Sequence, residues 1–213
     1  MQKHTKEGRH TDITPPGTLL RYVQLPWLMQ QYPRIPVFAL YNFLSGFLSI
    51  GLMAAFAVIL HSPLIFPSLG PTAFHYFSRQ TAPTASPRNA IIGHFIGIVA
   101  GYFSLVVTGL TTAGPAIANG VTWPRVIAAA LSLGLTAGLM LLFHTSHAPA
   151  GATTLIISLG ILTQPWQLVM LMIAIILLTL QAIAINRLFR MPFPLWSQPA
   201  APAKSVDGSD PSA

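Results

Sequence analysis

Residues 144–160 read HTSHAPAGATTLIISLG and interrupt an otherwise apolar second half of the chain. An apolar run precedes them and another follows, yet they include two histidines, a proline and a pair of threonines. Residues 61–74, HSPLIFPSLGPTAF, have a similar composition. Unpaired backbone groups are costly in lipid, so a broken helix is tolerated there only where protein or a watery cavity covers it. We therefore interpret these two stretches as the functional parts of the protein.

The composition is that of an integral membrane protein. Of the 213 residues, 53% are hydrophobic and only 7% are charged, whereas ~25% are charged in an ordinary soluble domain. The chain has no cysteine, which excludes disulfides, thiolate chemistry and cysteine-ligated metals. We expect the lipid bilayer to surround the chain, and we expect no nucleic-acid partner.

The distribution of charge points to an anion. Carboxylates occur only in the two tails, and residues 13–203 contain none. Membrane proteins that move cations usually hold them with buried carboxylates. A bound anion would compensate a buried arginine, which is costly when unpaired, although arginines at the cytoplasmic surface would equally satisfy the positive-inside rule. The arginines concerned are Arg21, Arg34, Arg79, Arg88, Arg125, Arg187 and Arg190.

The apolar pattern predicts an all-α polytopic membrane protein. Long runs that can each span a hydrocarbon core of ~30 Å occupy residues 38–60, 89–110, 125–143 and 166–185. Two short, broken segments lie between them at residues 63–78 and 149–163. Around this transmembrane domain, residues 37–190, we expect disordered tails at residues 1–17 and 191–213 and an interfacial elbow at residues 18–36.

Two topologies are compatible with the short segments. If both are re-entrant, the chain crosses four times and the arginine-containing loop 79–88 faces outward, against the positive-inside rule. If both cross, both termini and this loop are cytoplasmic and the chargeless loop 111–124 is outside. We favour the second arrangement, in which halves 38–110 and 125–186 form a 3+3 inverted repeat.

The openings of the short segments could bind a small anion. A helix N-terminus presents unpaired N–H groups and the positive end of the helix dipole, which makes it an anion site. Glycine lets an ion approach the backbone, and hydroxyls add donors. The candidate binding residues are Ser68, Gly70 and Thr72 in the first segment and Gly151, Thr153 and Thr154 in the second.

Histidines within the membrane are further candidates. A lone histidine near a helix end is commonly a capping residue, but titratable groups inside a membrane are candidates for function. We select His94 and His147 as proton donors or ion gates. No His-x-x-x-His pair occurs, so we expect no metal and no cofactor. We also see no nucleophile–base–acid set, so we expect no enzyme and no catalytic residue.

Small residues spaced four apart predict close helix packing. One such face contains Gly93, Gly97 and Gly101, and another contains Gly134 and Gly138. Faces of this kind let two helix backbones approach closely. They could pack within the chain or join two copies into a homo-oligomer.

Three ordered motifs resemble the HPP family of integral membrane proteins. HAPAGATTLIISLG is similar to the family signature His-Pro-Pro-Ala-Gly-Ala-Thr, with Ala148 in place of one proline. The other two are PSLGPTA at residues 67–73 and SPRNAIIGH at residues 86–94, where Arg88 and Asn89 belong to a Pro-Arg-Asn element. The resemblance implies four spanning helices. From this resemblance we expect a bacterial member without a CBS domain.

The resemblance also implies a substrate class. Plastid and cyanobacterial members are associated with nitrite transport, whereas most bacterial members have no assigned substrate. Together with the charge pattern, this predicts a transporter or channel for a small monovalent anion in the bacterial inner membrane. Arg88 would attract the anion from the cytoplasmic side. The alternative is a non-transporting membrane protein, either an assembly partner or a membrane-embedded enzyme.

Overall fold

The computed structural model describes residues 24–197, which form helices and no strand. The predicted tail at residues 1–17 lies outside the described range, as do the first part of the predicted elbow and the end of the C-terminal tail. The helices are α1 (Leu25–Gln31), α2 (Arg34–Ile59), α3 (Leu69–Ser78), the short 3-10 helix η2 (Pro83–Ala85), α4 (Pro87–Val107), α5 (Ala116–Asn119), α6 (Trp123–Leu142), α7 (Pro149–Ser158) and α8 (Pro165–Leu188).

Four helices are long and apolar enough to cross a membrane: α2, α4, α6 and α8. They coincide with the four long runs predicted from the sequence, so the all-α polytopic fold class is confirmed. The two short segments contain α3 and α7, each of 10 residues. The protein is thus a multi-pass membrane protein in which α3 and α7 occupy the two short segments between the long helices.

The sequence explains where several of these helices begin. Pro87, Pro149 and Pro165 each occupy the first helical position of α4, α7 and α8. That position needs no backbone N–H, and the fixed φ of proline suits it. Ser86 strengthens the start of α4, because its side chain accepts a hydrogen bond from the backbone N–H of Asn89 at 3.4 Å.

The two long helices that precede the short segments end in the same way. α2 ends at Ile59 and α6 ends at Leu142, and the residue two positions further on is a histidine in each case, His61 and His144, with φ values of 47° and 50°. In both cases the next amide donates to the carbonyl five residues back, at 3.1 Å after His61 and 2.8 Å after His144. This is the Schellman motif, whose left-handed position usually holds glycine. Both halves therefore break their first long helix at a histidine.

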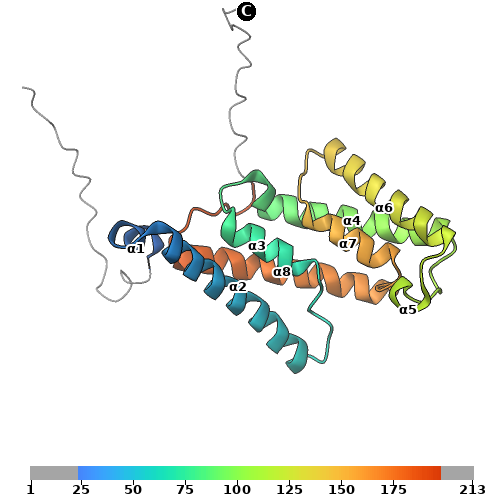
Figure 1. The fold of residues 1–213 in the computed structure, drawn as a ribbon, viewed down its shortest axis with the longest axis horizontal. Helices are drawn as coiled ribbons and strands as arrows, with labels where there is room; N and C mark the ends of the chain where they lie inside the picture. Colours follow the sequence, from blue (N-terminus) through green and yellow to red (C-terminus); the bar gives the residue numbers. More distant parts are fainter. Residues whose placement is uncertain (1–23, 198–213) are drawn as a thin grey trace, which may run out of the picture.

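The helices of the two halves run in opposite directions. In Figure 1, α2 and α4 run from left to right while α3 returns, whereas α6 and α8 run from right to left while α7 returns. α3 packs against α2 and α8, and α7 packs against α4 and α6. These directions are the ones that a 3+3 inverted repeat requires, but a symmetry between the halves stays a prediction.

Loop 79–88 lies at the same end of the bundle as the start of α1 and the end of α8 (Figure 1). The backbone N–H of Leu25 donates to Phe189 at 3.2 Å, and that of Arg88 donates to Trp196 at 2.9 Å. The six-crossing arrangement requires this placement. Which side of the membrane this end faces stays a prediction.

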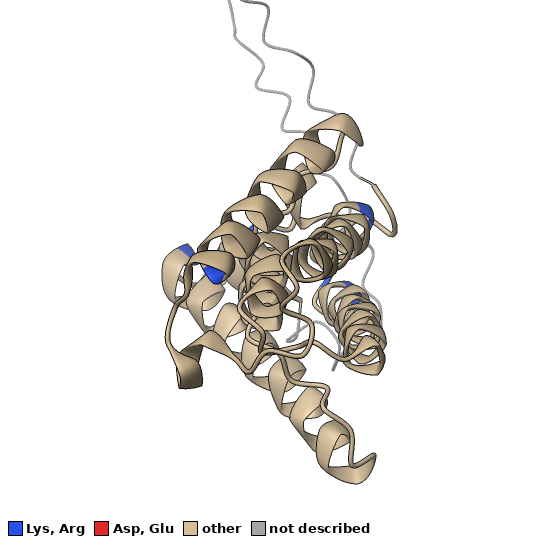
Figure 2. Ribbon diagram, turned by 90° about the vertical axis from the view of Figure 1, so that its right-hand side faces the viewer, with Lys and Arg blue, Asp and Glu red and all other residues tan. Residues whose placement is uncertain are grey.

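Arginine is the only charged residue in the described part of the chain. Figure 2 shows arginine positions in blue and no acidic position in red along the described ribbon, because every Asp and Glu lies outside residues 24–197. Arg125 lies apart from the others at the opposite end, where it is 3% exposed. Its guanidinium donates to the carbonyls of Ser158 at 3.0 Å and Gly114 at 2.8 Å. It therefore satisfies a backbone carbonyl at the C-terminus of α7.

The two glycine faces have different surroundings. The face of α4 packs on α7, and a Cβ atom at Gly97 would lie 2.8 Å from the carbonyl oxygen of Ala150. On α6, by contrast, a Cβ at Gly134 or Gly138 would meet no other atom within 4 Å. The first face is used inside the chain and the second is open. Association of two copies through α6 stays a prediction.

Candidate functional site

Four polar side chains form a buried cluster where α3, α4 and α7 meet. Thr72 lies near the N-terminus of α3, His94 in α4, His147 just before α7 and Thr153 in α7. Thr72 Oγ1 lies 2.9 Å from His94 Nε2 and 3.3 Å from His147 Nε2, and His94 Nδ1 lies 2.7 Å from Thr153 Oγ1. None of the four is more than 1% exposed. We call this group the histidine–threonine cluster.

Backbone carbonyls fix the proton positions around His147. His147 Nδ1 lies 2.8 Å from the carbonyl oxygen of Thr84. A carbonyl can only accept, so Nδ1 carries the proton and Nε2 of the neutral ring is an acceptor. Thr72 Oγ1 also lies 2.9 Å from the Ser68 carbonyl. The single hydroxyl proton of Thr72 therefore serves two acceptors, Ser68 and His147.

The position of the His94 proton follows from this arrangement. Because the Thr72 proton points to other acceptors, His94 Nε2–H must donate to Thr72 Oγ1. His94 Nδ1 is then free to accept from the hydroxyl of Thr153. The result is a directed chain of hydrogen bonds from Thr153 through His94 and Thr72 to His147, which connects the two short helices.

The close packing of α7 on α4 places Thr153 beside His94. A Cβ at Gly93 would lie 3.0 Å from His147 Cβ, and one at Gly97 would lie even closer to the backbone of Ala150. Larger residues at these positions would hold α7 away from α4. The glycine face predicted for helix packing is thus also what brings the cluster together.

The structure separates the predicted binding residues into two groups. Ser68 belongs to the cluster through its carbonyl, and its buried Oγ has no partner among the described residues. Gly70 is exposed, with no atom within 4 Å of a Cβ placed on it. Gly151 faces Leu133 of α6, and Thr154 Oγ1 donates to the Ser132 carbonyl of α6 at 3.4 Å. Of the helix-opening residues, only Ser68, Thr72 and Thr153 reach the cluster.

Arg88 and Asn89 form a second group nearer the end of the bundle. The Arg88 guanidinium donates to the carbonyls of Phe143 and His144 at 3.4 and 3.2 Å and to Asn89 Oδ1 at 3.1 Å. Asn89 Nδ2 donates to the Pro83 carbonyl at 2.9 Å. Six residues of helix separate Arg88 from His94, or about 9 Å along the axis. Arg88 thus donates hydrogen bonds to backbone carbonyls at the C-terminus of α6 and does not contact the cluster.

Two neighbours of the cluster were not among the predicted residues. The ring of His75 lies 5.9 Å from that of His147 between centroids, and its buried Nδ1 has no partner among the described residues. The spacing of His75 from Thr72, three residues along a helix, could have placed both on one face. The carbonyl of Thr84 could not have been found in this way, because a backbone acceptor has no signature in the sequence.

The fold and the cluster define a class: multi-pass membrane proteins with a polar site inside the helix bundle. The chain belongs to the HPP family, because the family description "HPP, transmembrane region" matches residues 33–194. A transmembrane protein of Dictyostelium discoideum is 30% identical over 165 residues, which cover 75% of this chain and 48% of that protein. The chain therefore spans about half the length of this relative. No solved structure matches the chain.

Proposed function

We propose that this protein is a transporter or channel for a small monovalent anion, which binds at the histidine–threonine cluster. The observation that carries the proposal is the meeting of two short helices at a buried group of hydroxyl and imidazole donors. Thr72 lies in the first turns of α3, and His147 immediately precedes α7. Both helices direct the positive ends of their dipoles toward this region, which favours an anion.

The chemistry of the surroundings supports the same proposal. No carboxylate lies within residues 24–197, so none is available there to bind a cation or repel an anion. The buried Oγ of Ser68 adds a hydroxyl that has no other partner among these residues. A small anion would replace the hydrogen bonds between Thr72 and the two histidines. Nitrite is the substrate that the family resemblance suggests.

Proton coupling follows from the state of His147. The neutral ring offers Nε2 as an acceptor, which repels an anion at that point. Protonation of Nε2 converts this atom into a donor and supplies the positive charge that the site lacks. An anion that binds beside Nε2 therefore favours uptake of a proton. We accordingly propose that the anion and the proton move together.

Substitution of Thr153 tests the site in liposomes. We compare Thr153→Asp with Thr153→Asn, which has a similar shape but no charge, for flux of nitrite, nitrate, formate and chloride. A carboxylate ~4 Å from the anion at an effective dielectric of ~20 costs about 4 kcal/mol, nearly a thousandfold in affinity. We expect flux to be lost only in the aspartate variant. Equal anion flux through both folded variants would show that the anion does not bind at this cluster.

Substitution of His147 tests the coupling. Glutamine can donate a hydrogen bond without a change of charge, so we expect His147→Gln to retain downhill nitrite flux. The variant should lose accumulation of nitrite driven by a pH gradient, which the unmodified protein should show. Accumulation at the level of the unmodified protein would exclude His147 as the proton carrier.

The proposed orientation places both termini in the cytoplasm of a bacterial inner membrane. Thr81 and Asn119 are exposed in the two loops at opposite ends of the bundle, and the chain has no native cysteine. We expect an impermeant thiol reagent added outside intact cells to label Asn119→Cys but not Thr81→Cys. The reverse pattern would mean that the chain is inserted the other way round.

A further inference from the structure

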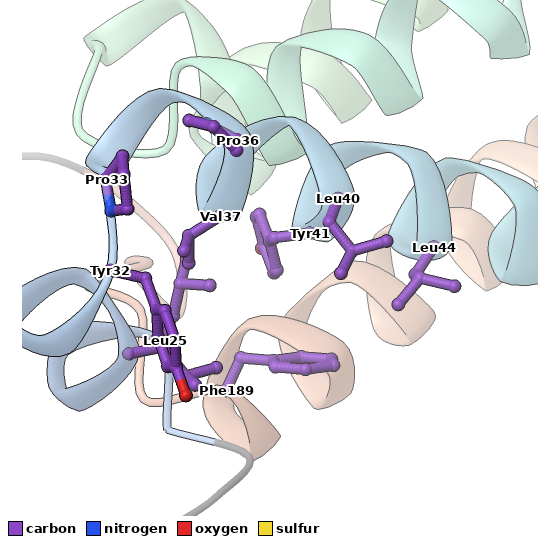
Figure 3. Close-up of a pocket in the computed structure, with 10 residues that line it drawn as sticks. Leu25, Tyr32, Pro33, Pro36, Val37, Leu40, Tyr41, Leu44 and Phe189 are labelled. Carbon is purple, nitrogen blue, oxygen red and sulfur yellow. The ribbon is translucent and has the colours of Figure 1, made fainter.

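An apolar pocket that shares no residue with the cluster lies where α1, the start of α2 and the end of α8 meet (Figure 3). Its volume is about 390 Å³, which lies within the range of small-molecule pockets, ~300–1,000 Å³. Figure 3 shows Val37, Leu40 and Leu44 of α2 along one side of it, with Leu25 and Phe189 at one end. Leu40 and Leu44 are 58% and 44% exposed. The pocket is therefore open on the outer surface of α2.

Cationic side chains flank this pocket in the sequence. Arg34 lies between the lining residues Pro33 and Pro36, and Arg187 and Arg190 lie on either side of the lining residue Phe189. All three arginines are exposed. Their side chains make no hydrogen bond or ion pair with another residue in the range 24–197, which also contains no carboxylate. Three cations without a counter-ion among the described residues thus lie within two residues of pocket-lining residues along the chain.

We propose that the pocket binds an anionic phospholipid, with an acyl chain against α2 and the phosphate at the arginines. The apolar lining fits a hydrocarbon chain and offers nothing to a free phosphate ion. The arginines fit a negatively charged headgroup, since juxtamembrane arginines attract anionic lipids. Tyr32 lies at the edge of the pocket, as tyrosines commonly do at the membrane–water interface.

Lipid retention by the purified full-length protein tests the charge requirement. Native mass spectrometry compares phosphatidylglycerol with phosphatidylcholine of the same acyl chains. We expect preferential retention of phosphatidylglycerol, reduced ~5-fold by each of Arg34→Gln and Arg190→Gln. Arg79→Gln is the matched control, because Arg79 is exposed at the same end but does not flank the pocket. Equal retention of the two lipids, or an equal effect of Arg79→Gln, would overturn the proposal.

A second set of measurements tests the acyl-chain position. Leu40→Trp fills the pocket from its exposed side, so it should reduce retention of phosphatidylglycerol while the arginines are intact. Excess inorganic phosphate should not displace the lipid. Retention unaffected by Leu40→Trp, or displacement by phosphate, would overturn the acyl-chain assignment. Rapid disulfide formation between Leu40→Cys and Leu19→Cys would assign the pocket to the chain's own N-terminal segment instead.

Discussion

The short helices α7 and α3 have the same length but are held in the bundle by different means. α7 lies against α4 with backbone close to backbone, since a Cβ at Gly97 would lie 2.8 Å from the Ala150 carbonyl. α3 is held through side chains. The Tyr76 hydroxyl lies 2.7 Å from Thr179 Oγ1 of α8, and Asn186 Nδ2 of α8 donates to the Tyr76 carbonyl at 3.3 Å.

This difference indicates which helix can move. Glycine contacts leave no side chain whose rotation could accommodate a shift, so α7 and α4 should behave as one rigid unit. Contacts through long side chains tolerate small displacements because rotamers can follow the backbone. We therefore expect α3 to move when the histidine–threonine cluster opens, and we expect Thr153 and His94 to stay together.

The largest expected effect comes from Gly97→Leu. The leucine Cβ would meet the carbonyl oxygen of Ala150, so α4 and α7 must move apart. The hydrogen bonds of the cluster would then be lost. Overpacking of this kind costs about 3 kcal/mol or more. Thermal unfolding in detergent measures the loss. Gly134→Leu is the control, because a Cβ there meets no other atom within 4 Å, and an equal loss in both variants would contradict the rigid contact.

A smaller effect is expected from Tyr76→Phe, which removes the hydroxyl that joins α3 to α8. Thr179 keeps its other hydrogen bond, to the Ile175 carbonyl at 2.7 Å, so no buried group is left unpaired. We expect a loss of about 1 kcal/mol and greater hydrogen exchange in α3 than in α7. Unchanged exchange in α3 would show that side-chain contacts do not limit its motion.

The smallest effect is expected from Gly70→Ala in α3. A Cβ there meets open space, and alanine favours the helix over glycine. We expect a gain of about 0.5 kcal/mol, measured by the same unfolding experiment. Gly101→Ala in α4 is the matched test in the tight interface, where the new Cβ would lie 3.0 Å from Thr154 O and Ile157. A gain at both positions would mean that the contact between α4 and α7 is not tight at Gly101.

The four long helices could be predicted because their apolar runs match the thickness of a bilayer. Half of the helix-opening residues lie outside the cluster, for a reason that the helical period explains. Thr153 and Thr154 are neighbours and project about 100° apart, so one faces His94 while the other faces α6. Gly70 and Thr72 are two apart and project to nearly opposite sides. The sequence motif contains both residues of each pair, and only the geometry of the helix shows that their side chains point in different directions.

The tertiary partners of the cluster could not be predicted in the same way. Nothing in the sequence says that the Thr84 carbonyl fixes the proton of His147, because any residue would supply a carbonyl. Likewise, the spacing of the α4 glycines predicts a close neighbour but not its identity. The neighbour is chiefly the short helix α7, although Gly93 also faces Met140 of α6.

The burial of Arg125 has a consequence for biogenesis. In the proposed orientation, this end of α6 must reach the far side of the membrane, against the positive-inside rule. One of its acceptors, the Ser158 carbonyl, lies 33 residues further along the chain. During synthesis, α6 therefore emerges from the ribosome while that acceptor is still inside it. Its final orientation should depend on α7, so a nascent chain that stops before residue 149 should leave α6 incompletely inserted.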